Sequence, residues 1–175
     1  LVITFEVDRA RAEFAEIFEL LPKYWARVGV EAVIKPMDRS LWEVRVRQNV
    51  DYDASIHRFG GGAGLTVLTD PRYYFPFNNN SLFAPAWALY YTNPSGKGAP
   101  YPPEEPPAPV KQQMQLYDQI KVTPDFEKQK QLMMQILDIS ADQFFAIGIS
   151  TEPSSYGIVK NNFKNVPTRL IESAL

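Results

Sequence analysis

The first 35 residues carry an apolar run, an amphipathic stretch and a second apolar run, and this order constrains the fold more than any other feature. Residues 1–7 are apolar and rich in β-branched side chains, which predicts a buried strand that ends at Asp8, a residue type suited to a helix N-cap. Apolar residues then recur at helical spacing, in the stripe Phe14, Ile17, Phe18, Leu21, Trp25 and Val28. Gly29 ends this predicted helix, and residues 30–35 predict a second strand. A β-α-β unit of this length favours parallel strands and a right-handed crossover, which indicates an α/β fold.

Further helices and strands follow this unit, each indicated by the period of its apolar residues. They are, in order, a short helix carrying Leu41, Trp42, Val44 and Val46, a strand over 52–59, helices over 110–121 and from Thr123 to Phe144, and strands over 145–149 and 156–160. The sequence therefore predicts one lobe with a mixed sheet flanked by helices.

Residues 60–109 differ from the rest because they show little periodicity. A glycine-rich turn at 60–64 precedes an aromatic and asparagine-rich stretch at 73–91, and seven prolines fall between 94 and 109. Fifty residues exceed what a plain loop in a compact domain contains. We expect a long irregular region that carries function or packs on a surface.

The composition excludes several classes of protein. The 175 residues have a net charge of −2 with both signs mixed along the chain, so no basic stripe could neutralise many phosphates and nucleic acid is not an expected partner. The absence of cysteine excludes a disulfide scaffold, a thiolate metal site and a cysteine nucleophile. The sequence contains no run of about 18 apolar residues, so it predicts no membrane-spanning segment.

Residues that could support catalysis are few. His57 is the only imidazole, so a two-histidine metal site is impossible, and a packed or partly solvated histidine is the favoured interpretation. The 60–64 turn lacks the Lys-Ser/Thr pair of a phosphate-binding loop. A glycosidase needs only two suitably placed carboxylates, and the candidates are Asp51, Asp53 and Asp70. No cofactor is expected.

The aromatic stretch is the strongest indication of a binding site. Eight aromatic residues fall within 19 positions, with three asparagines among them: Tyr73, Tyr74, Phe75, Phe77, Phe83, Trp87, Tyr90 and Tyr91. Aromatic faces beside amide groups can stack on and hydrogen-bond a polar organic ligand. The alternative is that these rings anchor a long loop to the core.

Several short motifs occur in an order and spacing that resemble one protein family. They are Arg27-Val28-Gly29-Val30-Glu31, Leu41-Trp42-Glu43, Asp51-Tyr52-Asp53-Ala54, the glycine turn, Thr69-Asp70-Pro71-Arg72-Tyr73-Tyr74, Asn93-Pro94-Ser95-Gly96-Lys97-Gly98 and Lys164-Asn165-Val166-Pro167. Together they resemble the C-terminal lobe of the family 5 extracellular solute-binding proteins, the oligopeptide, dipeptide, nickel and oligosaccharide receptors of ABC importers. The resemblance covers nearly the whole chain.

This resemblance implies a lobe of the periplasmic-binding-protein type II fold over residues 1–167, with 168–175 returning towards an N-terminal lobe outside this sequence. It implies a binding protein and not an enzyme, which closes on a small-molecule or peptide ligand and delivers it to an ABC permease in the membrane. It further implies a periplasmic or extracellular location, with the parent protein either lipid-anchored or free. The abrupt start without an initiator Met fits a piece of a longer protein.

The expected ligand contacts combine the glycine turn with the aromatic stretch. They are Phe59, Gly60, Gly61, Gly62, Asp70, Tyr73, Tyr74 and Trp87. In peptide-binding members of the family, an Asp three residues after a strand-ending aromatic pairs with the amino group of the peptide. Here the aromatic is Phe59 and the third position is Gly62, so the resemblance favours sugars or other neutral polar solutes unless Asp70 takes over by loop rearrangement.

Two alternatives to a solute receptor stay open. One is a hydrolase that acts through Asp53 or Asp70. The other is a protein-interaction domain that offers the proline-rich segment 94–109 as a polyproline ligand, which predicts that this segment is mobile and sensitive to proteases.

Overall fold

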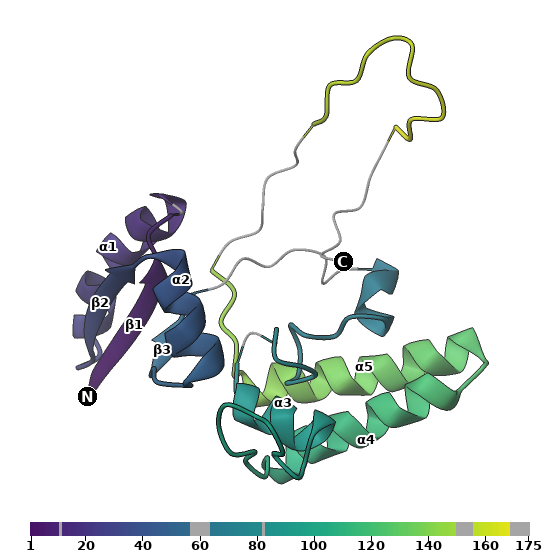
Figure 1. Cartoon of the computed structure of the whole chain (residues 1–175), viewed down its shortest axis with the longest axis horizontal. Coiled ribbons are helices and arrows are strands. Elements are labelled where there is room, and N and C mark those ends of the chain that lie inside the picture. The colour runs from purple at the N-terminus through teal and green to yellow at the C-terminus, as the bar shows by residue number, and fades with distance from the viewer. Residues whose placement is uncertain (11, 57–63, 82, 150–155, 169–175) are drawn as a thin grey trace. The chain divides into compact units, whose positions relative to one another are not determined.

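The computed structural model describes residues 1–10, 12–56, 64–81, 83–149 and 156–168 (Figure 1). The chain divides into two compact units. Unit 1 comprises Leu1–Arg58 and Pro76–Pro107, and unit 2 comprises Phe59–Phe75 and Ala108–Leu175. The sheet belongs to unit 1, and the longest of the described helices, with 18 residues, belongs to unit 2.

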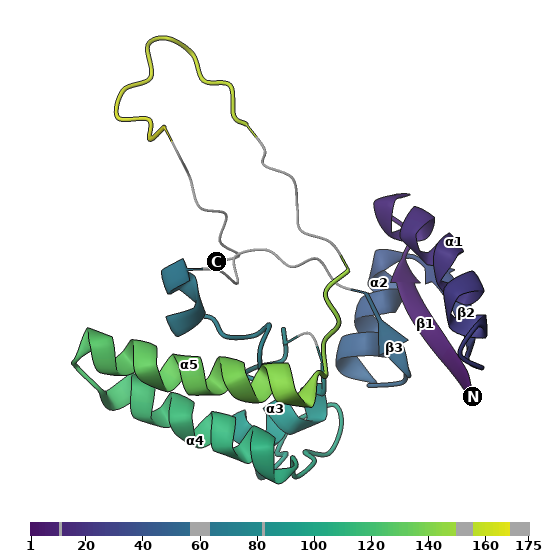
Figure 2. The same cartoon turned by 180° about the vertical axis from the view of Figure 1, so that it is seen from behind.

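Unit 1 contains a small parallel sheet. The central strand β1 (Val2–Asp8) pairs with β2 (Glu31–Met37) on one side and with β3 (Ala54–Ser55) on the other. Helix α1 (Ala12–Ala26) connects β1 to β2, as Figures 1 and 2 show. The predicted β-α-β unit is confirmed, and the chain is α/β. The expected mixed sheet is instead a parallel one over the described residues.

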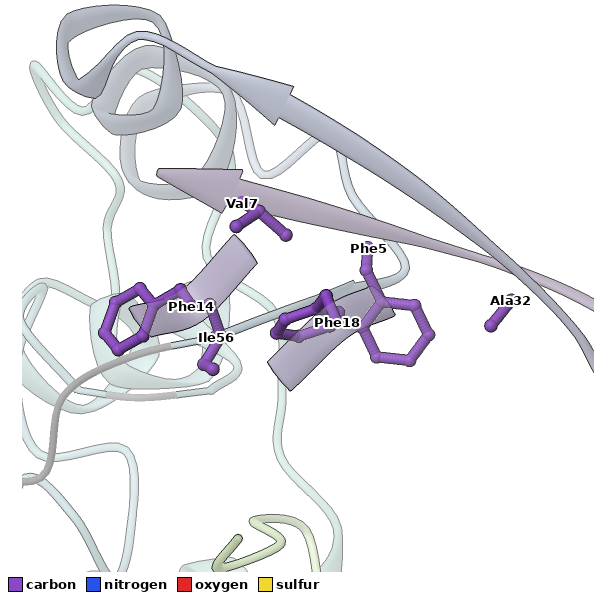
Figure 3. Close-up of a cluster of buried hydrophobic side chains, with 6 residues drawn as sticks. All are labelled: Phe5, Val7, Phe14, Phe18, Ala32 and Ile56. Atoms are coloured by element: carbon purple, nitrogen blue, oxygen red, sulfur yellow. The ribbon is translucent and has the colours of Figure 1, made fainter. Parts of the chain in front are cut away.

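One face of the sheet packs against α1. Because side chains alternate along a strand, Phe5 and Val7 of β1 point to the same face. They meet residues from α1, from β2 and from the position directly after β3 in a buried cluster (Figure 3), which consists of Phe5, Val7, Phe14, Phe18, Ala32 and Ile56. The Phe5 ring lies 5.3 Å from that of Phe18 and 5.2 Å from that of Trp25, measured between centroids. This apolar contact fixes α1 on the sheet.

The opposite face of the sheet is polar and lies under a second helical segment. Here Glu6 of β1 is in register with Ser55 of β3. Helix α2 (Arg39–Trp42) continues directly into a π-helical segment, η1 (Glu43–Gln48). Trp42 Nε1 donates to the Glu6 carbonyl at 3.2 Å and to Ser55 Oγ at 2.9 Å, so α2 is joined to two strands. Helical segments thus cover both faces, as parallel sheets require.

The region predicted to be irregular contains a helix and ordered turns. Helix α3 (Pro85–Thr92) begins with Pro85 at its first position, where a missing backbone N–H costs nothing. Sequence reasoning missed this helix because its apolar residues surround the helix instead of forming one stripe. After α3, the Asn93 side-chain amide donates to the Lys97 carbonyl at 3.2 Å, and the Glu104 N–H donates to the Ala86 carbonyl at 3.1 Å. The proline-rich segment is therefore hydrogen-bonded back to α3.

Unit 2 is built on two long helices that lie side by side (Figures 1 and 2). Both α4 (Ala108–Val122) and α5 (Phe126–Gln143) were predicted, and both are confirmed. Asp125 caps α5 by accepting the Lys128 N–H at 2.7 Å. A short 3₁₀ helix, η2 (Gly64–Leu68), opens the described part of this unit. The buried residues of the helix pair are Val110, Gln113, Met114, Leu116, Tyr117, Ile120, Leu132, Met133 and Ile136.

Two strand predictions are wrong over the residues that the structure describes. Segments 145–149 and 156–160 form no strand there, and Ile147 and Ile158 are 60% and 89% exposed. An apolar run becomes a strand only when a neighbouring strand satisfies its backbone groups, and the run itself does not reveal that neighbour. The strand predicted over 52–59 is observed as Ala54–Ser55, and 57–59 lie outside the described residues. No helix within the described ranges is long and apolar enough to cross a membrane.

Candidate functional site

The residues nominated for ligand binding fall in separate parts of the structure. Trp87 lies on α3 in unit 1 and is partly buried. Asp70, Tyr73 and Tyr74 lie in unit 2, in the loop that follows η2. The predictions for Phe59, Gly60, Gly61 and Gly62 fall outside the described residues.

Asp70 is held in a two-point ion pair with Arg72. Arg72 Nε donates to Asp70 Oδ1 at 2.7 Å, and its Nη2 lies 2.5 Å from Oδ2. About four fifths of each side chain is buried, since 20% of Arg72 and 19% of Asp70 are exposed. The hydrogen bond with Asp70 raises the pKa of Arg72 above its ordinary value. Both oxygens of the Asp70 carboxylate are therefore occupied by its neighbour in the loop.

The aromatic residues next to this pair divide between core and surface. Tyr73 is 5% exposed and Phe75 is fully buried, with the Phe75 ring 5.5 Å from that of Tyr117. These two rings have the anchoring role that was the alternative to stacking on a ligand. Tyr74 keeps part of its surface, and burial of the remainder raises the pKa of its phenol. Tyr74 is thus the ring of this loop with surface left for a ligand.

The backbone of Tyr74 is fixed from the helix pair. Its carbonyl accepts the Ser140 hydroxyl at 2.5 Å and the Gln113 side-chain amide at 3.4 Å. The same Gln113 amide donates to the Ile136 carbonyl at 3.0 Å and lies 2.9 Å from Ser140 Oγ. Gln113 is 2% exposed, so this small polar network is buried between α4, α5 and the loop. It holds the Asp70–Tyr74 loop in one conformation.

In unit 1, charged residues gather at the carboxyl end of the sheet. Asp8 ends β1, is 3% exposed, and accepts the Ala10 N–H at 3.0 Å and an Arg39 N–H at 3.2 Å. Asp38, directly after β2, pairs with Arg9 at 2.6 Å. The two strand ends meet at one edge of the sheet because the strands run parallel. Each carboxylate at this edge has an arginine partner.

A second group of charges lies under η1. Glu6 is 1% exposed, and its Oε1 accepts from Arg45 Nη2 at 2.9 Å and from Nε at 3.2 Å. Arg45 also pairs with Asp51 at 3.1 Å. The Trp42 ring has the Arg39 guanidinium at 4.7 Å and that of Arg47 at 5.6 Å from its centroid, both within cation–π range. The salt bridges and the contacts of the Trp42 indole together fix α2 and η1 on the polar face of the sheet.

A small cavity adjoins this group. Its volume is about 10 Å³, which is room for about one water molecule. Polar groups converge on it from Arg47, which donates to the Asn79 carbonyl at 2.8 Å, and from Tyr52, whose pKa is raised mainly by burial. The full lining is Trp42, Val46, Arg47, Tyr52, Ser55, Asn79, Ser81 and Pro85. The cavity is too small for an organic solute.

The groups considered for catalysis have structural contacts. Asp53 Oδ2 accepts the backbone N–H of Thr4 at 2.9 Å, which ties the segment before β3 to β1. Asp70 is paired with Arg72, as above. His57 falls outside the described residues. Within the part of the chain that the structure describes, no three His, Cys, Asp or Glu residues are grouped as a metal site would require.

Sequence reasoning missed the charged groups on the polar face of the sheet. The signal was present, because the otherwise apolar first strand carries Thr4, Glu6 and Asp8 at every second position. This alternation indicates a strand with one polar face, and acidic residues on a covered face require cationic partners. Which arginines supply them depends on the path of the chain after β2.

A scan against protein-family models and a search of curated proteins each found no match for this chain.

Proposed function

We propose that the chain is one lobe of the substrate-binding component of an ABC importer, which captures a small polar solute of the oligosaccharide or oligopeptide class. The motif order that resembles the family 5 solute-binding proteins supports this proposal. The observation that carries it is the arrangement of the sheet, in which β1 lies between β2 and β3 and all three strands are parallel.

This strand order creates a point where connections diverge. The connection after β1 leads to β2, which is the neighbour of β1 at one edge of the sheet. The connection after β2 passes β1 and leads to β3 at the opposite edge. The two connections cover opposite faces, with α1 on one face and α2 with η1 on the other. In open α/β sheets, ligands bind beyond the carboxyl ends of the strands at such a point. Here that position follows Asp8 of β1 and Ser55 of β3.

The sequence after β3 supports the same location. Shortly after β3 (Ala54–Ser55), the sequence contains Phe59, Gly60, Gly61 and Gly62. Glycines without side chains let a backbone approach a ligand closely. Within unit 1, Trp87 of α3 also keeps a partly exposed ring.

The proposed activity needs no covalent chemistry. A solute held by hydrogen bonds and aromatic contact is enclosed when two lobes close, and closure shifts the protein towards the form that a permease recognises. The partners in this proposal are a second lobe of the same protein and an ABC permease. The location is periplasmic or extracellular. The hydrogen-bonded turns of the proline-rich segment favour this function over display of a polyproline ligand.

Thermal unfolding tests the proposal. We would screen the full-length protein that carries this chain against di- to pentasaccharides, di- to pentapeptides and nickel chelates. A ligand at about 100 times its dissociation constant stabilises the folded state by about 2.7 kcal/mol. For a protein of this size, the unfolding temperature should then rise by several degrees. Absence of a shift across the whole panel would contradict the proposal.

A further inference from the structure

We infer that the small cavity of unit 1 is a binding site for one structural water molecule, which joins the turn before α3 to the segment that enters β3. The inference does not depend on the proposed function. Every residue that lines the cavity belongs to unit 1 and is described by the structure. The lining comes from three stretches of the chain, which are α2 with η1, residues 52–55 and residues 79–85.

The size of the cavity suits one water molecule and excludes larger ligands. Its volume of about 10 Å³ is close to the smallest space that holds a water. The apolar part of the wall is well covered, because Trp42 and Val46 are 2% and 5% exposed and Pro85 is buried. A purely apolar cavity stays dry, so the polar groups in the wall decide whether water binds.

Ser81 supplies a buried donor to this cavity. It is 6% exposed, and its oxygen accepts the backbone N–H groups of Phe77 at 2.8 Å and of Asn78 at 3.1 Å. These two bonds use the lone pairs of the hydroxyl and leave its proton, for which the described residues supply no acceptor. A buried donor without an acceptor is unfavourable, and the oxygen of a water molecule would provide the acceptor.

Tyr52 and Ser55 bring two further hydroxyl groups. The described residues supply no hydrogen-bond partner for the Tyr52 hydroxyl, and burial raises the pKa of this phenol, so at neutral pH it stays protonated and can donate or accept. Ser55 Oγ accepts from Trp42 Nε1 at 2.9 Å and donates to the Glu6 carbonyl at 3.2 Å. One lone pair of Ser55 Oγ therefore remains for a donor in the cavity.

A water molecule matches these groups better than an ion does. Its oxygen can accept from Ser81 and Tyr52, and one of its protons can be donated to Ser55, which gives about the three partners that internal waters usually have. No carboxylate is among the lining residues, and the charged residue among them is Arg47, so the site disfavours a cation. A polyatomic anion exceeds the volume of the cavity.

A high-resolution crystal structure of the full-length protein that carries this chain tests the site directly. We expect a water molecule in the cavity within about 3 Å of at least two of the hydroxyl oxygens of Ser81, Tyr52 and Ser55. Oxygen-17 relaxation dispersion then measures whether this water is long-lived in solution. A dry cavity, or a water that contacts only one of the three hydroxyls, would overturn the inference.

A matched pair of valine variants assigns the long-lived water to this cavity. V46I adds one methyl group at the buried wall, so the number of long-lived waters should fall by one. V44I adds the same group at a position that is 37% exposed, and the number should stay unchanged. An unchanged number in folded V46I would overturn the inference.

Y52F provides a second test that does not depend on the folding of V46I. It keeps the aromatic ring and removes one hydroxyl from the cavity wall. The water should then exchange with bulk solvent about fivefold faster, the factor expected for the loss of one hydrogen bond. Y24F removes a hydroxyl from an exposed ring and is the control, because it should leave the exchange rate unchanged. Equal exchange rates in Y52F and in the unchanged protein would also overturn the inference.

Discussion

Arg45 and Glu6 form an ion pair between η1 and the polar face of the sheet, with Arg45 Nη2 2.9 Å from Glu6 Oε1. Glu6 is 1% exposed and sits on the central strand, so its charge is neutralised by Arg45 alone among the described basic groups that reach it. A carboxylate buried to this degree is tolerated only when it is paired. The pair therefore decides whether η1 can lie on the sheet.

Removing Arg45 should destabilise the protein strongly. In R45M, the Glu6 carboxylate is left buried without its cation, and the free energy of unfolding should fall by about 3 kcal/mol. Urea denaturation followed by circular dichroism measures this change. R9M is the matched control, because the Arg9–Asp38 pair is 62% and 64% exposed and its loss should cost at most about 1 kcal/mol. Equal losses in the two variants would contradict the assigned role of Glu6.

Trp42 should contribute through its indole N–H as well as through its size. W42F keeps an aromatic ring but removes the donor to the Glu6 carbonyl and to Ser55 Oγ, so we expect a loss of about 2 kcal/mol. W25F serves as control, because the Trp25 ring packs edge-on to Phe5 and most of that contact survives as Phe. Unfolding in guanidinium chloride compares the two. A smaller loss for W42F than for W25F would show that the indole hydrogen bonds do not join α2 to the strands.

The buried amide of Gln113 should hold the Asp70–Tyr74 loop on the helix pair. Q113L removes the donor to the carbonyls of Tyr74 and Ile136, and the unfolding free energy should fall by about 1 to 3 kcal/mol. Q115L makes the same substitution at an exposed position of α4 and should change stability by less than about 0.5 kcal/mol. Hydrogen exchange at the loop amides gives a second measurement. Unchanged exchange in Q113L would place the support of this loop elsewhere.

Four tyrosines should make the protein sensitive to alkaline pH. Burial raises the pKa of each above the ordinary value of 10; they are Tyr52, Tyr74, Tyr101 and Tyr117. Above pH 10 the unfolded state therefore binds fewer protons than the native state, and stability falls as pH rises. This contribution is complete below pH 10 and is lost between pH 10 and the raised values. Urea titrations from pH 8 to 11 should show the decline, and Y117F should reduce its slope, whereas Y24F changes an exposed ring and should not.

The parts of the fold that follow from local pattern could be predicted. Residues 1–35 form the expected β-α-β unit. Three of the four ends of α4 and α5 lie within two residues of the predicted ends, because each helix carries a regular apolar period. Segment 145–149 has an equally apolar run but forms no strand, since pairing depends on a distant neighbour. The spacing of apolar residues indicates which face of a helix or strand is buried, but not which element covers that face.

The candidate site could be predicted only in part, for a similar reason. The aromatic stretch identified a loop of interest, yet composition could not separate the buried Tyr73 from the partly exposed Tyr74. The sequence also placed Asp70 among the ligand contacts without indicating that Arg72, two positions later, engages both of its oxygens. Whether two residues two positions apart form an ion pair depends on the conformation of the loop, and the spacing of the residues alone does not determine that conformation.

The turn in the proline-rich segment gives a last and sharply controlled prediction. Gly96 has φ +63°, and a Cβ added to it would lie 2.7 Å from Pro103 Cδ, a ring atom that cannot rotate away. Gly98 has φ +74°, and a Cβ there would meet nothing within 4 Å. Both substitutions by alanine incur the left-handed backbone cost of about 1 kcal/mol, but only G96A adds a steric clash.

G96A should therefore lose more stability than G98A, by about 1 to 2 kcal/mol, because the clash forces the turn and the Pro103 ring apart. It should also expose residues 94–107 to limited proteolysis, whereas G98A should leave cleavage close to that of the unchanged protein. Denaturation and a protease time course measure both effects. Rapid cleavage of this segment in the unchanged protein would contradict the packed turn and would support the alternative of a mobile polyproline ligand.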